Sequence, residues 1–228
     1  MIRTILFDLD DTLLDFKRAE AEALEKALRQ MGLTPTPHVI SRYSIINQQQ
    51  WQLLEDKVLT RDEVLVRRFD LLFQEFSLTA DAEKTQRLYH ALLAEGAYYL
   101  PGAEELLQAL YEKYDLYAVS NGTAAVQDPR IEKTGIGRYF KDIFISERVG
   151  VDKPDVRFFD RCFARIPGFK KEEAVIIGDS LTSDIRGGNN AGIRTCWFNP
   201  HHMPQKPGVH VDNEVDALDK IPALIKSL

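Results

Sequence analysis

Residues 4–12, which read TILFDLDDT, are the stretch that decides the fold. An apolar, β-branched run leads into Asp8, and Asp10 follows two residues later. Residues i and i+2 of an extended chain point to the same side, so the carboxylates of Asp8 and Asp10 are expected to face one site. Ligands of open α/β sheets bind at the carboxyl ends of the strands. The stretch therefore predicts a buried strand over Thr4–Leu9 that presents two carboxylates to a ligand.

Further apolar runs bounded by turn-forming residues are predicted as strands. They are Leu116–Ser120, Ile143–Ser146, Ala174–Gly178, Arg194–Phe198 and a short candidate near His210. From Pro101 onward these strands alternate with helical stretches, which is typical of βαβ units, and a final helix ends at Leu228. Because the strands are apolar almost throughout, we expect an α/β fold in which helices cover both faces of one parallel sheet.

Residues 15–100 follow a different pattern, because they contain no strand candidate. Apolar residues recur there at three- and four-residue spacing, for example at Leu65, Phe69 and Leu72. Breaks at Gly32–Pro37 and Ser77–Asp81 suggest about four helices. The pattern predicts an all-helical domain over residues 15–100, inserted into a core formed by residues 1–14 and 101–228.

The composition excludes several classes of function. The chain has 228 residues, 44% of them hydrophobic, and a net charge of −6 with no clustered basic run, so duplex nucleic acid is not an expected partner. The apolar runs are far shorter than the roughly 20 residues that cross a bilayer, and the first begins almost at Met1. We therefore expect a cytoplasmic monomer with no membrane contact, in which Cys162 and Cys196 are buried reduced thiols.

Three more elements that can carry chemistry follow predicted strands. Ser120-Asn121-Gly122 offers a hydroxyl and backbone amides to an anion, although the same residues could form a plain turn. Lys153 lies in a loop before a helix, where it could neutralise a phosphate or remain a solvated charge. Asp179 and Asp184 follow the strand Ala174–Gly178 and could equally be an N-cap and a first-turn acid.

The order of these elements along the chain favours a single site. Two acids, a hydroxyl, a lysine and two further acids all lie at the carboxyl ends of predicted parallel strands, an arrangement that independent helix capping would not favour. Buried carboxylates this close repel one another unless a cation or a shared proton intervenes. Mg²⁺ suits hard carboxylate ligands and leaves positions for water and phosphate. The set predicts an acidic, metal-binding pocket with an anion cradle.

As a set, the four elements resemble the motifs of the haloacid dehalogenase-like (HAD) hydrolase superfamily, whose members are mostly Mg²⁺-dependent phosphatases. The resemblance covers nearly the whole chain and implies a Rossmann-like core with a C1-type cap over residues 15–100. The stretches DDTLLDF (10–16), DLYAVSNG (115–122) and GIRTCWFNP (192–200) are similar to the branch that contains bacterial pyrimidine 5′-nucleotidases. That branch usually carries Thr where Ser120 stands, and the substitution keeps the hydroxyl.

The resemblance implies a role for each matching residue. Asp8 would be the nucleophile that forms an aspartyl-phosphate, and Asp10 the general acid and then the base. Mg²⁺ would be held by the Asp8 carboxylate, the Asp10 backbone carbonyl and Asp179. Asp184 would be a ligand through water or a partner that orients Lys153. Phosphate would be bound by Lys153, Ser120 and the amides near Asn121 and Gly122.

We therefore expect a phosphomonoester hydrolase, and specifically a 5′-nucleotidase that acts on pyrimidine nucleoside monophosphates. Dehalogenases of the superfamily lack the second acid of the first motif, so Asp10 favours phosphoryl chemistry. A sugar-phosphate phosphatase, a phosphomutase resembling β-phosphoglucomutase and a non-catalytic ligand-binding protein stay open as alternatives. Substrate selection is expected in the cap. The candidates are Phe16, Lys17, Asn47, Trp51, Arg67 and Arg68, for which core packing (Trp51) or a solvated charge (Arg67, Arg68) is the ordinary alternative.

Overall fold

A six-stranded parallel sheet forms the centre of the protein, and the computed structural model describes all of residues 1–228. The strands lie in the order β3-β2-β1-β4-β5-β6. Their bounds are β1 (Thr4–Phe7), β2 (Asp115–Ser120), β3 (Asp142–Ile145), β4 (Ala174–Gly178), β5 (Arg194–Phe198) and β6 (Asn213–Val215). β1 lies between β2 and β4, with Phe7 paired to Ala118 and to Ile177. The predicted α/β class with one parallel sheet is confirmed.

Four strands differ in their bounds from the prediction, and β2 differs only by starting one residue earlier, at Asp115. β1 ends at Phe7 rather than at Leu9, because the chain turns directly afterwards and the Asp11 amide donates to the Leu14 carbonyl at 2.7 Å. β3 ends at Ile145 because the next residue begins the short helix α7 (Ser146–Val149). The last strand is Asn213–Val215 rather than a segment near His210, since β5 supplies ladder partners only there.

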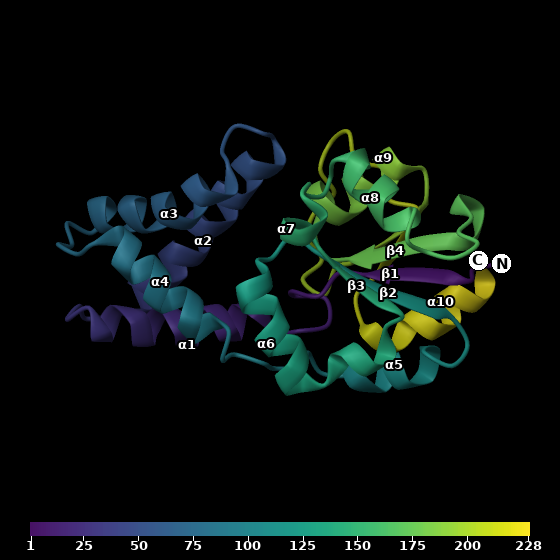
Figure 1. Cartoon of the computed structure of the whole chain (residues 1–228), viewed down its shortest axis with the longest axis horizontal. Helices are drawn as coiled ribbons and strands as arrows, with labels where there is room; N and C mark the ends of the chain where they lie inside the picture. The colour runs from purple at the N-terminus through teal and green to yellow at the C-terminus, as the bar shows by residue number, and fades with distance from the viewer.

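Helices cover both faces of the sheet, as Figure 1 shows. Along β1 the side chains alternate: Ile5 and Phe7 pack in the same apolar cluster as α5 and α10, whereas Leu6 packs in the cluster that contains α8 and α9. The bounds of these helices are α5 (Ala103–Leu110), α8 (Val156–Phe163), α9 (Arg186–Ala191) and α10 (Ile221–Ser227). The connections contain α6 (Ala124–Thr134), η1 (Ile136–Tyr139), η2 (Lys171–Glu173), η3 (Leu181–Ile185) and η4 (Leu218–Lys220).

Four helices between β1 and α5 form a separate layer, which we call the helical insert. They are α1 (Phe16–Gln30), α2 (Pro37–Glu55), α3 (Arg61–Glu75) and α4 (Ala82–Leu93), and all lie within the predicted segment 15–100. Each begins after an Asp or Thr whose side chain accepts a hydrogen bond from a backbone amide three residues on.

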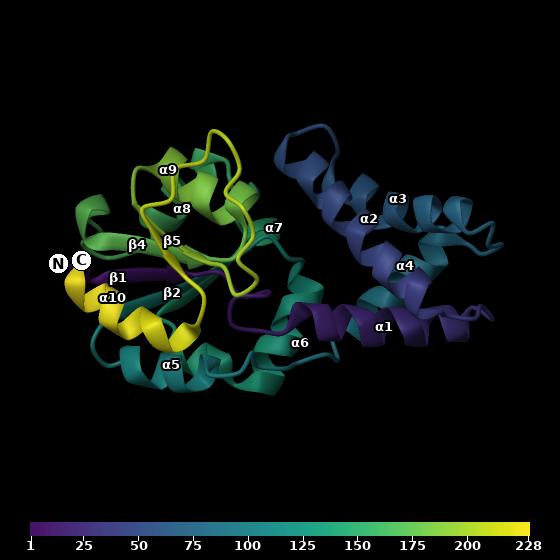
Figure 2. The same cartoon turned by 180° about the vertical axis from the view of Figure 1, so that it is seen from behind.

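The helical insert has its own apolar core, centred on the rings of Tyr43, Phe69 and Tyr89, whose centroids lie 5.2 to 5.5 Å apart. Figure 2 shows the insert to one side of the sheet, near α6. Among all the helices of the chain, none combines the length and the apolar character needed to cross a membrane.

Candidate active site

The ends of three neighbouring strands place the candidate residues beside one another. Asp8 follows β1, Ser120 ends β2 and Asp179 follows β4, so the sheet pairing alone brings them to one edge. β2 and β3 lie on one side of β1, whereas β4, β5 and β6 lie on the other, so the strand order changes direction beside β1. Ligands of open α/β folds usually bind at the carboxyl ends of the strands at such a point. A cavity of about 940 Å³ lies there, lined by the core on one side and by the helical insert on the other.

Asp8, Asp179 and Asp184 form a carboxylate cluster in this cavity. One carboxylate oxygen from each residue lies within 4.8 Å of the others. The buried Lys153 ammonium donates to Asp8 Oδ1 at 2.7 Å and to Asp184 Oδ1 at 2.6 Å. Gly178 allows Asp184 to approach, because a Cβ at that position would lie 2.3 Å from the Asp184 carboxyl group. The structure thus brings together Asp8, Lys153 and the pair Asp179 and Asp184, which belong to three separate elements of the sequence.

The electrostatics of the cluster favour a divalent cation. Burial, opposed by the charge of Lys153, raises the pKa of Asp8 to about 8. Burial and then the charges of Asp8 and Asp184 raise the pKa of Asp179 well above its ordinary value. Although burial disfavours the charged ammonium, Asp184 and Asp8 raise the pKa of Lys153. Burial and mutual repulsion thus oppose ionisation of these carboxyl groups, and a divalent cation would offset this repulsion; their hard oxygen donors fit Mg²⁺.

Thr12 supports Asp179, a role that was not predicted from the sequence. The Thr12 hydroxyl donates to Asp179 Oδ1 at 3.3 Å and accepts from the Asp179 amide at 3.1 Å. On the other side, the Trp197 indole donates to the Asp179 carbonyl at 2.8 Å. Asp179 lies in the loop after β4, and these contacts fix the position of this candidate metal ligand. The sequence does contain a hint of this role, because the Thr12 hydroxyl directly follows Asp10 and Asp11.

The loop after β2 departs in part from its prediction. The Gly122 amide donates to Ser120 Oγ at 3.1 Å, so it is not free to bind an anion. The Asn121 side chain is directed at Lys153, accepting from its amide at 2.8 Å and donating to its carbonyl at 2.9 Å. Asn121 thereby holds the loop that carries Lys153. Ser120 is 1% exposed and lines the cavity, as do Asn121 and Gly122.

Two buried residues of α6 hold Asp10, and neither was predicted from the sequence. Arg130 Nη1 donates to Asp10 Oδ1 at 2.5 Å, and Gln127 Nε2 donates to Asp10 Oδ2 at 2.7 Å. Gln127 also donates to Ser120 Oγ at 2.8 Å. Their three-residue spacing places them on one helix face, but nothing local to α6 indicates that this face points at Asp10.

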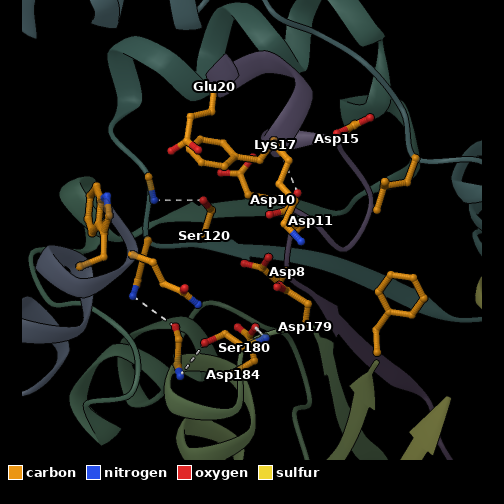
Figure 3. A pocket seen from close by; sticks show the side chains of 18 of the residues that line it. Asp8, Asp10, Asp11, Asp15, Lys17, Glu20, Ser120, Asp179, Ser180 and Asp184 are labelled. Carbon is orange, nitrogen blue, oxygen red and sulfur yellow. Dashed lines mark hydrogen bonds between the residues drawn. The ribbon is translucent and has the colours of Figure 1, made fainter. Parts of the chain in front are cut away.

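A polar wall from the helical insert closes the cavity opposite the carboxylate cluster. Asn47 donates to Glu20 Oε1 at 2.6 Å and accepts from Arg68 Nη1 at 2.8 Å, and Ser44 donates to Glu20 Oε2 at 2.5 Å. We call Glu20, Ser44, Asn47 and Arg68 the insert polar cluster. In Figure 3, Glu20 and Asp184 lie at opposite ends of the pocket with Asp8 between them. Burial raises the pKa of Glu20.

The other predicted specificity residues separate into two groups. Phe16, Lys17 and the half-buried Trp51 line the cavity with the insert polar cluster. Arg67 is exposed and lies outside the cavity, whereas its neighbour Arg68 is 2% exposed and lines it. Adjacent residues of a helix point in different directions, so only one of the two arginines can face the pocket. The structure therefore gives the prediction for Arg67 no support, and it contradicts the solvated alternative for Arg68.

A second contact between the insert and the core involves Arg61 at the start of α3. Arg61 donates to the carbonyls of Asn121 at 2.9 Å and Gly122 at 3.0 Å, and it forms an ion pair with Asp152. Its guanidinium also donates to Ser146 Oγ at 2.7 Å. The first residue of α3 thus binds the loop that carries Ser120 and the residue before Lys153.

Glu55, at the end of α2, brings a further carboxyl group into the cavity. Its side chain is 10% exposed, and Oε2 has no hydrogen-bond partner. Burial raises its pKa to about 7. Arg186 lies 3.9 Å from Oε2 and opposes this effect only in part.

Comparison with known proteins places these features in a family. A family model described as haloacid dehalogenase-like hydrolase matches residues 5–198. The chain is 41% identical over 219 residues to the HAD-hydrolase YfnB of Bacillus subtilis (strain 168), covering 96% of this chain and 93% of that protein.

Two relatives carry the name pyrimidine 5′-nucleotidase. PynA of Streptococcus pneumoniae is 41% identical over 220 residues, covering 94% of this chain and 93% of that protein. YjjG of Escherichia coli is 31% identical over 221 residues, covering 97% and 96%. A crystal structure of YfnB, bound to magnesium and described as revealing interdomain movement, has a TM-score of 0.94 at 40% identity and covers 98% of each chain.

Proposed function

Because the chain belongs to the haloacid dehalogenase-like hydrolase family, we propose that it is a Mg²⁺-dependent 5′-nucleotidase acting on pyrimidine nucleoside monophosphates through an aspartyl-phosphate. The convergence of Asp8, Asp179, Asp184 and Lys153 at the ends of β1 and β4 is the observation that carries the proposal. The names of PynA and YjjG support the substrate class.

In this mechanism Asp8 attacks phosphorus in line with the leaving oxygen. A bond forms between the Asp8 carboxylate and phosphorus while the bond from phosphorus to the 5′ oxygen breaks, and Asp10 donates a proton to that oxygen. Asp10 then removes a proton from water, whose oxygen forms a bond to phosphorus while the bond from phosphorus to Asp8 breaks, so that inorganic phosphate leaves and the Asp8 carboxylate is regenerated. Lys153 and Ser120 stabilise the equatorial phosphate oxygens during both steps.

Asp8, Asp179 and the Asp10 carbonyl would hold Mg²⁺. Asp184 lies 2.6 Å from Lys153, which favours the role of orienting the lysine and leaves contact through water open. When bound, Mg²⁺ would offset the repulsion between the anionic nucleophile and the anionic phosphate.

The helical insert supplies the residues that we propose select the substrate. A nucleobase could stack on Trp51, whose indole lies 5.6 Å from the Arg61 guanidinium, while the insert polar cluster offers polar groups to the edge of the base. Phe16 and Lys17 line the same cavity, and we propose that they contact the sugar. We further propose that residues 15–100 act as a cap and that the enzyme works as a cytoplasmic monomer.

The test is phosphate release from a panel of nucleoside monophosphates and sugar phosphates, with Mg²⁺ and with EDTA. Wild type is compared with Asp8→Asn, Asp10→Asn and the control Asp115→Asn, which makes the same change at the opposite edge of the sheet. We expect a preference for UMP, dUMP or dTMP that EDTA and Asp8→Asn abolish. Asp10→Asn should bind Mg²⁺ without turnover, and Asp115→Asn should keep its activity.

The other outcomes identify the alternatives. Release mainly from sugar phosphates would replace the nucleotidase assignment and leave the mechanism intact. A product that retains phosphate would indicate a phosphomutase. Binding without turnover, equal in wild type and Asp8→Asn, would contradict the enzyme assignment itself.

A further inference from the structure

Arg130 is a fully buried cation that the mechanism above does not use. Its side chain is 0% exposed and projects from α6 toward the junction between the core and the helical insert. Nη1 lies 2.5 Å from Asp10 Oδ1, and Nε donates to the Gly96 carbonyl at 2.9 Å. Phe16 begins α1, and its ring centroid lies 5.8 Å from the Arg130 guanidinium carbon. One side chain therefore contacts Asp10, which lies after β1, and both segments that join the insert to the core.

Asp10 depends on such contacts for its orientation. It lies beyond the end of β1, its side chain is 26% exposed, and the next residue, Asp11, has a φ of 57°. An isolated bridge between Asp10 and Leu14 holds the backbone of this turn but does not set the direction of the Asp10 side chain, and apolar packing cannot fix a partly exposed carboxylate. The two hydrogen bonds from α6 supply the constraint: Arg130 holds Oδ1, and Gln127 holds Oδ2.

The contacts form a connected network. Arg130 Nη1 also donates to Gln127 Oε1 at 2.9 Å, so each side chain orients the other. Gln127 Nε2 is shared between Asp10 and Ser120 Oγ. The same pair of residues thus sets the relative positions of the proposed proton donor and the proposed phosphate-binding hydroxyl.

We propose that Arg130, with Gln127, is the positioning residue for Asp10, and that it ties the orientation of this carboxyl to the segment around Gly96. The inference rests on the proposed function, because it assigns Asp10 the proton transfer to the leaving oxygen. Proton transfer requires the donor within hydrogen-bond reach of the leaving oxygen, so a displaced Asp10 fails even though its own chemistry is unchanged.

The test uses the leaving group as the readout. UMP releases an alkoxide that needs a proton, whereas p-nitrophenyl phosphate releases a stable phenolate that departs without one. For both esters, kcat/KM is measured in the same preparation of wild type, Arg130→Met, Arg130→Lys and Gln127→Met. The ratio of the two values does not depend on the fraction of folded protein, so it remains informative if a variant is partly unfolded.

Lys133→Ala is the matched control. Lys133 lies on the same helix, is exposed, and also contacts the insert side of the junction through the Ala94 carbonyl at 3.4 Å, but it is remote from Asp10 in the hydrogen-bond network. Its ratio of kcat/KM values should equal that of the wild type.

For Arg130→Met we expect kcat/KM to fall about 100-fold with UMP and less than about fivefold with p-nitrophenyl phosphate. In Arg130→Lys, kcat/KM with UMP should fall less, because lysine keeps the positive charge but lacks the planar guanidinium. In Gln127→Met, kcat/KM should again fall more with UMP than with p-nitrophenyl phosphate, but by a smaller factor than in Arg130→Met. Equal losses with both esters, or no loss, would overturn the positioning role while leaving the proposed function in place. A wild type that hydrolyses neither ester would overturn both.

Discussion

The α/β core and the helical insert place polar side chains in one cavity by different means. In the core, Asp8, Ser120 and Asp179 follow neighbouring parallel strands, so the backbone ladder sets their spacing. In the insert, Glu20, Asn47 and Arg68 come from three helices, so their spacing depends on how these helices pack and on the hydrogen bonds between the side chains. This difference suits the division of tasks that we propose, in which the sheet edge positions the groups for chemistry and the wall of the insert selects the substrate.

The largest effect is expected in the core. Lys153→Met removes the only cation of the carboxylate cluster, so kcat should fall about 1,000-fold with every ester tested. Steady-state kinetics with UMP and ribose 5-phosphate measure this, with Lys170→Met, an exposed lysine, as the control. A fall in kcat with only one of the two substrates would contradict the proposal that the core performs the chemistry and the insert selects the substrate.

The Arg61 contact tests whether the two regions are coupled. Arg61→Ala removes hydrogen bonds to the carbonyls of Asn121 and Gly122 and leaves Asp152 without its partner. We expect kcat/KM to fall about 30-fold, which corresponds to about 2 kcal/mol. Arg67→Ala alters an exposed arginine of the same helix and should have no effect. Equal activity of the two variants would show that the insert need not contact the loop after β2.

Trp51 tests selection by the insert. Trp51→Leu removes a ring that lines the cavity and should lower kcat/KM for UMP about tenfold, because stacking of a base on an aromatic ring contributes about 1–3 kcal/mol. Ribose 5-phosphate lacks a base and should be hydrolysed as by the wild type. Trp51→Phe keeps an aromatic face and should restore most of the loss. An equal fall for both substrates would assign Trp51 to the structure of the insert instead.

At Glu55 the expected change is in stability rather than in activity. Burial raises the pKa of Glu55 from 4.5 to about 7, so the native state holds this proton more tightly than the unfolded chain does. The resulting stabilisation is complete below pH 4.5 and is lost as the pH rises through about 7. Glu55→Gln cannot ionise, and in EDTA its free energy of unfolding should exceed that of the wild type by up to about 3 kcal/mol at pH 8.

Denaturant titrations of wild type and Glu55→Gln at pH 4 and pH 8 measure this difference. The two proteins should be equally stable at pH 4. A variant that is less stable at pH 8 would show that Arg186 pairs with an ionised Glu55 strongly enough to reverse the effect of burial.

Local sequence patterns were sufficient to predict the sheet and most of the residues at its edge. Asp8 and Asp179 directly follow apolar runs, and the parallel order of strands follows from their alternation with helices, so the meeting of strand ends is a consequence of topology. Strand ends were less predictable: β1 stops at Phe7 because a turn competes with the ladder, and the last strand lies at Asn213–Val215 because that is where β5 offers partners.

The residues that hold the site in place were beyond the sequence argument. Thr12 reaches Asp179 across 167 positions of the chain, Arg61 reaches Asp152 across 91, and Arg130 reaches Asp10 across 120. Helical periodicity also failed to separate Arg67 from Arg68, because the face that points at the cavity depends on how α3 packs against α2 and α4.

By itself, the sequence determined the fold class, the family resemblance and the candidate catalytic acids, since short-range patterns of apolar and charged residues encode where strands end and which groups follow them. The tertiary structure alone decided which side chains orient those acids and which residues of the insert face them. These pairs lie far apart along the chain and meet only when α6 and the helical insert pack beside the sheet, so no local pattern records them.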